Sequence, residues 1–241
     1  VRIDPATGQV LALFDPNPEF SGLIVGQVQR LRWRAADGVP AYGDLVLPPD
    51  HRPGTRHPLV VVQYQSRGFL RGGTGDEYPI HAFAARGFAV LSVQRPRFFG
   101  AGKARDFDEL MRMQTRNFAE RRHVLASLEA GVGAVVSGGW ADAARIGITG
   151  LSDGAATVQF ALINSSLFRA AAVSSCCDEP STSMFAADRG YADLLIAAGF
   201  PAPGVPDPDF WSRYSLAANA RRLRTPILFQ LTDDEFRLGL E

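Results

Sequence analysis

The chain has 241 residues, of which 46% are hydrophobic, and its 25 Lys and Arg side chains balance 25 Asp and Glu side chains. This composition supplies enough apolar residues for one sizeable folded core and excludes a disordered chain. The even charge balance argues against a general nucleic-acid surface, and no apolar run reaches membrane-spanning length. Neither a nucleic acid nor a membrane is therefore an expected partner.

The first residues carry turn signals between short β-prone stretches. Asp4-Pro5 with Gly8 marks one turn, and residues 15–18 mark another. We expect residues 1–24 to be the tail of a preceding β domain, and residues 25–241 to form the main α/β domain. That domain begins with an alternating run over 25–33, which predicts a half-buried strand. A hairpin turn at Asp37-Gly38 then leads to a second strand over 41–47.

Further along the chain, predicted strands alternate with predicted helices. The helices are expected over 80–85, as one long segment over 107–136, and from the middle of the chain to about residue 163. Strands alternating with helices indicate a mostly parallel, doubly wound α/β sheet with helices on both faces. The expected buried strands are 59–64, 88–93, 146–149, 170–173 and 227–231.

The most informative stretch lies between a predicted strand and a predicted helix. Residues 150–154 read Gly-Leu-Ser-Asp-Gly and match the pattern G-x-S-x-G. At a strand-to-helix junction this spacing predicts a sharp turn that exposes the central serine as a nucleophile. The alternative is an ordinary turn rich in glycine and serine. The position of the motif favours Ser152 as a catalytic nucleophile.

An acid and a base are needed to activate such a serine. Asp233 and Asp234 follow the last predicted strand, and one of them is expected to be the acid; the alternative role is a helix N-cap. The four histidines all precede Ser152, which does not fit the order serine, acid, histidine. We expect His51 and His57 to be solvated, and the catalytic histidine to lie beyond residue 241.

Two groups are candidates for the oxyanion hole. One is the backbone N–H of Asp153, the residue after the nucleophile. The other is the phenol of Tyr64 at the end of a predicted strand, although a tyrosine of the core or rim fits the sequence equally well.

Arginines on loops near the same predicted cleft are suited to binding a peptide carboxylate, although solvated side chains are the alternative for each. The sequence contains no metal-binding cluster, phosphate loop or dinucleotide fingerprint, so neither a metal nor a cofactor is expected. The candidate substrate-binding residues are Arg67, Arg71, Arg95 and Arg97.

Several segments, in order, resemble the catalytic domain of the prolyl oligopeptidase family. They are residues 58–64, 87–93, 145–154, 168–173 and 226–234. Within that family, residues 64–78, the Gly-Leu-Ser-Asp-Gly elbow and residues 230–236 are most similar to the lasso peptide isopeptidases, which cleave the isopeptide bond of threaded peptides. The usual oligopeptidase has Gly-Gly-Pro after the tyrosine and Ser-Tyr-Gly-Gly at the elbow, whereas this chain has Gln-Ser-Arg and Ser-Asp-Gly-Ala.

The resemblance implies an α/β-hydrolase fold that follows a β-propeller, which would explain residues 1–24. It implies that Tyr64 serves the oxyanion hole and that the acid is Asp233 or Asp234, with Asp233 slightly favoured. The predicted function is hydrolysis of a lasso peptide's isopeptide bond by a Ser-His-Asp mechanism. The alternatives are a conventional oligopeptidase, an acylaminoacyl-peptidase or an esterase, and a non-catalytic hydrolase-fold protein that only binds peptide.

Overall fold

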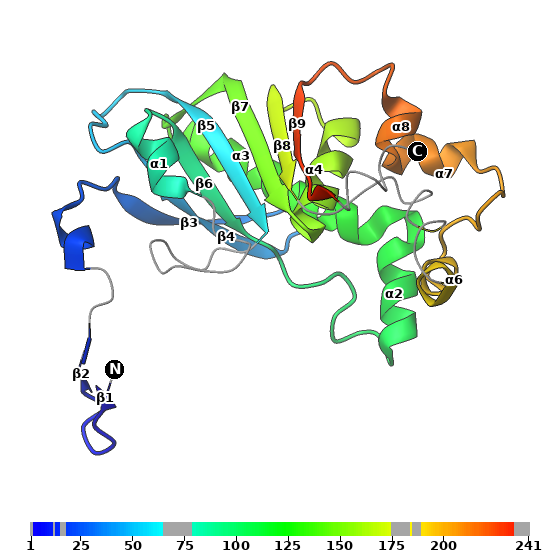
Figure 1. Ribbon diagram of the computed structural model, residues 1–241, viewed down its shortest axis with the longest axis horizontal. Coiled ribbons are helices and arrows are strands. Elements are labelled where there is room, and N and C mark those ends of the chain that lie inside the picture. The colour runs from blue at the N-terminus through cyan, green and yellow to red at the C-terminus, as the bar shows by residue number, and fades with distance from the viewer. Residues whose placement is uncertain are drawn as a thin grey trace.

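The central element of the computed structural model is a seven-stranded sheet with the order β3-β4-β6-β5-β7-β8-β9 (Figure 1). The structure describes residues 2–11, 13–14, 18–64, 79–174, 184 and 189–233. The pairs β3–β4 and β4–β6 are antiparallel, and the remaining pairs are parallel. This arrangement confirms the predicted α/β-hydrolase sheet. The strands are β3 (Val28–Arg34), β4 (Pro40–Val46), β5 (His57–Tyr64), β6 (Ala89–Gln94), β7 (Ala141–Leu151), β8 (Ala170–Ser174) and β9 (Ile227–Gln230).

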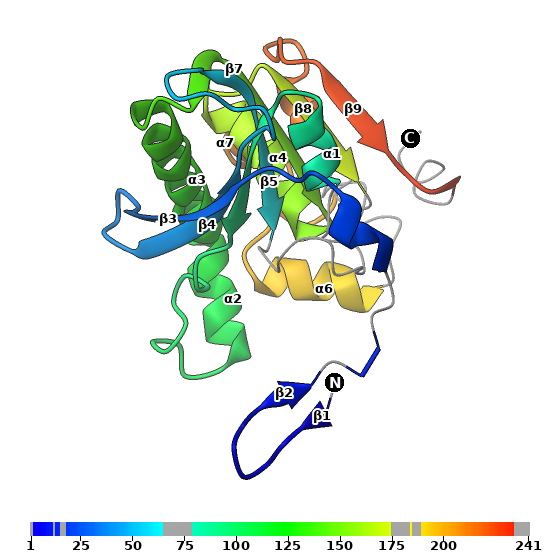
Figure 2. The same ribbon diagram turned by 90° about the vertical axis from the view of Figure 1, so that its left-hand side faces the viewer.

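Helices cover both faces of this sheet because the central strands are apolar on both sides. On one face, α1 (Ile80–Ala85) packs against Val62 and Val90. On the other face, α3 (Ala119–Ser137) and α4 (Asp153–Asn164) bury Val61 and Leu91. Figure 2 shows α1 on one side of the sheet and α3 and α4 on the other. Alternate residues of the same strands thus enter different cores.

The predicted burial of the last strand was wrong. In β9, Leu228 is 68% exposed and Phe229 is 49% exposed. The cause is the position of β9 at the edge of the sheet, where β8 is its pairing partner among the described strands. A continuous apolar run therefore indicated a strand correctly, but not a strand covered on both faces.

The expected single helix over 107–136 is broken. The structure has α2 (Phe107–Thr115), a 3-10 turn η2 (Arg116–Phe118) and then α3. The break lies at Asn117 and Phe118, whose φ angles of 56° and 55° are left-handed. The break lets the ring of Phe118 pack against Phe160 and stack on Tyr214.

The smaller elements lie on either side of this framework along the chain. β1 (Arg2–Ile3) and β2 (Val10–Leu11) form a separate antiparallel pair, which stands away from the main sheet in both ribbon views (Figures 1 and 2). The turn η1 (Pro18–Gly22) follows it. After β8 come α6 (Arg189–Ala197), α7 (Pro208–Tyr214) and α8 (Leu216–Asn219). Among the described helices, none is both long and apolar enough to cross a membrane.

Candidate active site

Ser152 lies at a sharp turn between β7 and α4, as its motif predicts. Its backbone has φ 55° and ψ −126°, a conformation that L-residues rarely adopt. The N–H of Ser152 donates to the carbonyl of Ser174 at 3.1 Å, and its own carbonyl accepts from the N–H of Ala155 at 2.8 Å. The residue is exposed. This geometry presents a serine hydroxyl at the carboxyl end of β7, in the manner of a nucleophile elbow.

The sheet register brings the other candidate segments to the same end of the sheet, where the parallel strands have their carboxyl ends. Gln63 pairs with Gly150, which places the backbone of Tyr64 beside the elbow. Gly150 pairs in turn with Val173, and Val173 with Phe229, so β8 and β9 end at the same level. Carboxyl ends of parallel strands are where ligands of open α/β sheets bind. The elbow therefore lies where this fold places its sites.

Of the predicted acids, Asp233 follows β9 at this edge and is exposed. Asp234 lies outside the described residues, as do Arg67 and Arg71 and the side chain of Tyr64. Their predicted roles stay predictions.

The carboxylate of Asp153, next to the nucleophile, is held between two arginines. Nη2 of Arg121 donates to Oδ1 of Asp153 at 2.7 Å, and Nη1 of Arg95 donates to Oδ2. Arg95 also donates to Glu120 through Nη2 at 2.7 Å. The second carboxylate oxygen of Glu120 accepts from the backbone N–H of Phe99 at 2.6 Å. We call Arg95, Glu120, Arg121 and Asp153 the charged quartet.

The quartet is largely withdrawn from solvent, and its ion pairs shift the pKa values of Asp153 and Arg121 toward the ionised forms. The side chains of Arg95, Glu120 and Arg121 are 10%, 8% and 16% exposed. Burial raises the pKa of Asp153, but Arg121 and Arg95 lower it more, so the net shift is downward. Burial lowers the pKa of Arg121, whereas Tyr214 and Asp153 raise it, with a net upward shift. Two positive and two negative charges therefore form a neutral unit.

This arrangement bears on the predicted peptide-binding arginines. The guanidinium of Arg95 faces two carboxylates and lies 4.6 Å from the ring centroid of Phe98. Arg97 is exposed, on the loop that follows β6. The side chain of Arg97 is therefore open to solvent, while that of Arg95 is paired with two carboxylates of the protein. Their predicted binding of substrate stays a prediction. Sequence patterns gave no signal for Glu120 and Arg121, because their role depends on where α3 begins.

The histidines lie away from the elbow or have other partners. His57 opens β5 and so lies at the amino end of that strand, opposite the elbow, and its Nε2 lies 2.8 Å from Nδ1 of His51. The prediction that both are solvated was wrong for His57, which is 9% exposed. The ring of His123 contacts Asp37 through Nδ1 and the carbonyl of Arg97 through Nε2. His81 lies in α1 on the far face of the sheet.

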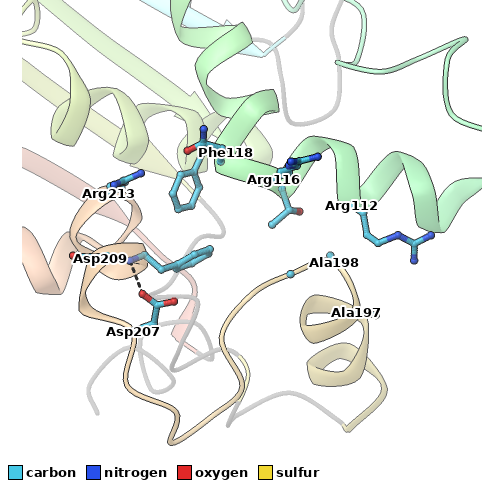
Figure 3. A pocket seen from close by; sticks show the side chains of 12 residues that line it. Arg112, Arg116, Phe118, Ala197, Ala198, Asp207, Asp209 and Arg213 are labelled. Carbon is cyan, nitrogen blue, oxygen red and sulfur yellow. Dashed lines mark hydrogen bonds between the residues drawn. The ribbon is translucent and has the colours of Figure 1, made fainter.

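A hollow of about 560 Å³ lies between the α2–α3 break, α6 and α7 (Figure 3). Phe118 and Phe210 contribute apolar surface to it, and Arg116 and Arg213 contribute charge. In Figure 3 the side chain of Arg112 extends away from the hollow. Asp207 is used within the protein, since it caps α7 by accepting from the N–H of Phe210 at 2.9 Å. The sequence did not predict this hollow.

Within the described part of the chain, no group of three His, Cys, Asp or Glu side chains is arranged to hold a metal ion.

Comparison with known proteins gives consistent relatives, although no family model matches the sequence. The chain is 44% identical over 98% of its length to the lasso peptide isopeptidase AtxE2 of Asticcacaulis excentricus, covering 34% of that protein. A serine-to-alanine variant of AtxE2 with Astexin3-dC4 bound superposes with a TM-score of 0.90 at 42% identity, over 99% of this chain and 37% of that one. The acylaminoacyl peptidase of Pyrococcus horikoshii shares the fold, with a TM-score of 0.64 and 22% identity, over 91% of this chain and 34% of that one. The chain thus spans about a third of the length of these relatives.

Proposed function

We propose that the chain is the catalytic domain of a serine isopeptidase of the prolyl oligopeptidase family, which opens the ring of a threaded peptide. The observation that carries the proposal is the backbone of Ser152, an exposed serine with φ 55° at a strand-to-helix turn. A non-glycine residue in this conformation costs about 1–3 kcal/mol, and such strain is concentrated at functional sites. An ordinary surface turn can form without such backbone strain.

The proposed reaction begins with attack by Ser152 Oγ on the carbonyl carbon of the isopeptide bond. A histidine outside residues 1–241 takes the hydroxyl proton and returns it to the leaving amine. The acyl-enzyme is then hydrolysed by water, which restores the serine and releases a carboxylate. This assignment is supported by the positions of two of the histidines, since His57 lies at the amino end of β5, away from the elbow, and His123 is bound to Asp37.

The remaining catalytic roles are assigned to groups at the carboxyl ends of the parallel strands. We assign the N–H of Asp153 and the phenol of Tyr64 to the oxyanion, and the carboxylate of Asp233, or of Asp234, to orienting the histidine. Asp233 is supported by its position just beyond β9. Arg97, with Arg67 and Arg71, is the proposed contact for peptide carboxylates, whereas the partners of Arg95 favour a role inside the protein.

The threaded substrate is supported by the relatives. AtxE2 is named a lasso peptide isopeptidase, and its serine-to-alanine variant has a structure with Astexin3-dC4 bound. For domain organisation, we propose that residues 1–24 end a preceding β-propeller and that residues 25–241 belong to the hydrolase domain. The separate β1–β2 pair supports this division.

The test is hydrolysis by the full-length protein that carries this chain. A threaded peptide, a linear peptide of the same sequence and p-nitrophenyl esters are incubated separately, and the products are identified by mass spectrometry. Opening of the threaded peptide, abolished by Ser152→Ala, is the expected result. Cleavage of only linear peptides or esters would favour a conventional peptidase or esterase. Failure of a fluorophosphonate to label Ser152 would overturn catalysis and leave a peptide-binding protein.

A further inference from the structure

We propose that the charged quartet is a positioning device that fixes the backbone N–H of Asp153 toward the oxyanion. The inference rests on the proposed function, because it assumes that this N–H stabilises a transition state. Arg95, Glu120 and Arg121 are positioning residues: they act on the reacting atoms through Asp153.

The first support is the number of directions from which Asp153 is held. Its carboxylate is bound by Arg95, from the loop after β6, and by Arg121, from α3. Its carbonyl oxygen accepts from Arg121 Nη1 at 3.3 Å and from Thr157 Oγ1 at 3.1 Å. The first residue of α4 is thus tied to two other elements by its side chain and its main chain. Catalytic donors work when they are preorganised, because they then need no rearrangement during reaction.

The second support is the backbone that leads into the quartet. Asn117 and Phe118 are both left-handed and come directly before the helix that carries Glu120 and Arg121. Two such residues in succession cost about 1–3 kcal/mol each. Continuing α2 without the break would change the direction of α3. The contact between the rings of Phe118 and Phe160, 6.0 Å between centroids, fixes the same break against α4.

The third support is that stability alone does not explain this arrangement. A buried ion pair is weak evidence for stability, since desolvation offsets most of the attraction. The four charges cancel, so the quartet does not act by placing a net positive field at the oxyanion. Its distinctive property is directional, since charge-assisted hydrogen bonds hold a carboxylate in one place.

The test uses Asp153→Asn, which keeps the shape of the side chain and removes its charge, and Arg121→Met, which removes the guanidinium. In the full-length protein we expect kcat for a p-nitrophenyl ester to fall about 10- to 100-fold in each variant, with KM within twofold of wild type, since misplacement by about 1 Å costs up to about 100-fold. The double variant should be no slower than Asp153→Asn, because both changes break one unit. Arg121→Lys should recover part of the loss.

Asp142→Asn is the matched control. It breaks the salt bridge in which Nε of Arg145 lies 2.7 Å from Oδ2 of Asp142, near the other end of β7. The substitution should leave kcat unchanged. Thermal melts and circular dichroism are recorded for every variant. A merely structural quartet would lower the melting temperature and leave kcat at 25 °C unchanged, which would overturn the proposal. If Arg121→Met does not fold, Asp153→Asn and Arg121→Lys decide the question by the same kcat criterion.

The outcomes separate this inference from the proposed function. An active wild type with unchanged variants overturns the inference alone. A wild type that cleaves esters but not the threaded peptide overturns the proposed substrate and leaves the positioning role measurable on esters. A wild type in which Ser152 neither reacts with a fluorophosphonate nor hydrolyses esters overturns both.

Discussion

A Cβ atom added to Gly150 would lie 2.3 Å from the carbonyl oxygen of Gly154, a distance that no real pair of such atoms adopts. The end of β7 and the first turn of α4 therefore pass each other at a separation that only glycine permits. The second atom in the way is also backbone, the carbonyl carbon of Gly154 at 2.4 Å. No rotation of a side chain can relieve the conflict, so the elbow depends on the absence of a side chain at residue 150.

Gly150→Ala should destabilise the domain strongly, by about 3 kcal/mol or more, which is at or above the upper end for overpacking. The measurement is thermal or urea unfolding, together with labelling of Ser152 in the full-length protein. The control is Gly147→Ala on the same strand, where a new Cβ would meet the carbonyl oxygen of Ala170 at an ordinary 3.5 Å. Equal stability of the two variants would show that the elbow can open without cost.

Ser152→Gly should raise stability by about 1 kcal/mol while abolishing hydrolysis. The backbone at φ 55° strains a residue that has a Cβ, and glycine relieves about 1–3 kcal/mol of strain against about 0.5–1 kcal/mol of added unfolded-state entropy. Ser152→Ala removes the same hydroxyl but keeps the Cβ, so its melting temperature should stay below that of the glycine variant. A glycine variant that melts below the alanine variant would refute the strain argument.

The sheet was predictable because its signals are local. Apolar runs such as 59–64 and the G-x-S-x-G motif indicate strands and the elbow from neighbouring residues alone. The break at Asn117 and Phe118 was not predictable, since neither is glycine or proline and the apolar spacing continues across it. Tertiary packing of Phe118 against α4 and α7 decides it.

The same limit applies to the site. The position of Ser152 follows from its motif, but the partners of Asp153 do not, because they come from segments 58 and 32 residues away. Arg95 was predicted to bind substrate from its place on a loop after a strand. Which way a loop arginine points depends on the carboxylates of other elements, here Asp153 and Glu120. The sequence motif predicted where the candidate site lies, but it did not predict the contacts within that site.

Gln63→Met should stabilise the domain. The side chain of Gln63 is completely buried in β5, and neither its Oε1 nor its Nε2 has a hydrogen-bond partner within the described structure. A buried polar group without a partner costs about 1–3 kcal/mol, so an apolar side chain of similar volume should raise the free energy of unfolding by about that amount. Unfolding in urea measures it. A less stable methionine variant would indicate that the amide is satisfied, for example by a buried water.

Stability should fall on acidification partly because of His57. Burial, and then the neighbouring His51, lower the pKa of His57, while Asp50 opposes and Arg145 reinforces the shift. The unfolded chain therefore binds a proton at His57 more readily than the folded protein does. The stability conferred by the neutral ring is fully present above the unfolded pKa of about 6.5, and it is lost as the pH falls from there through the folded pKa. His57→Gln should lose less stability than wild type between about pH 7.5 and 5.5. Identical slopes in melts across this range would exclude the effect.

The acid of the proposed triad can be identified by a pair of substitutions at adjacent positions. Asp233→Asn in the full-length protein should lower kcat by about 10⁴-fold, because an orienting carboxylate fixes the tautomer of the catalytic histidine. Asp234→Asn is the matched control and should stay within about tenfold of wild type. Labelling of Ser152 by a fluorophosphonate should slow in the first variant only. The reverse pattern would assign the acid to Asp234, and two fully active variants would remove both residues from the mechanism.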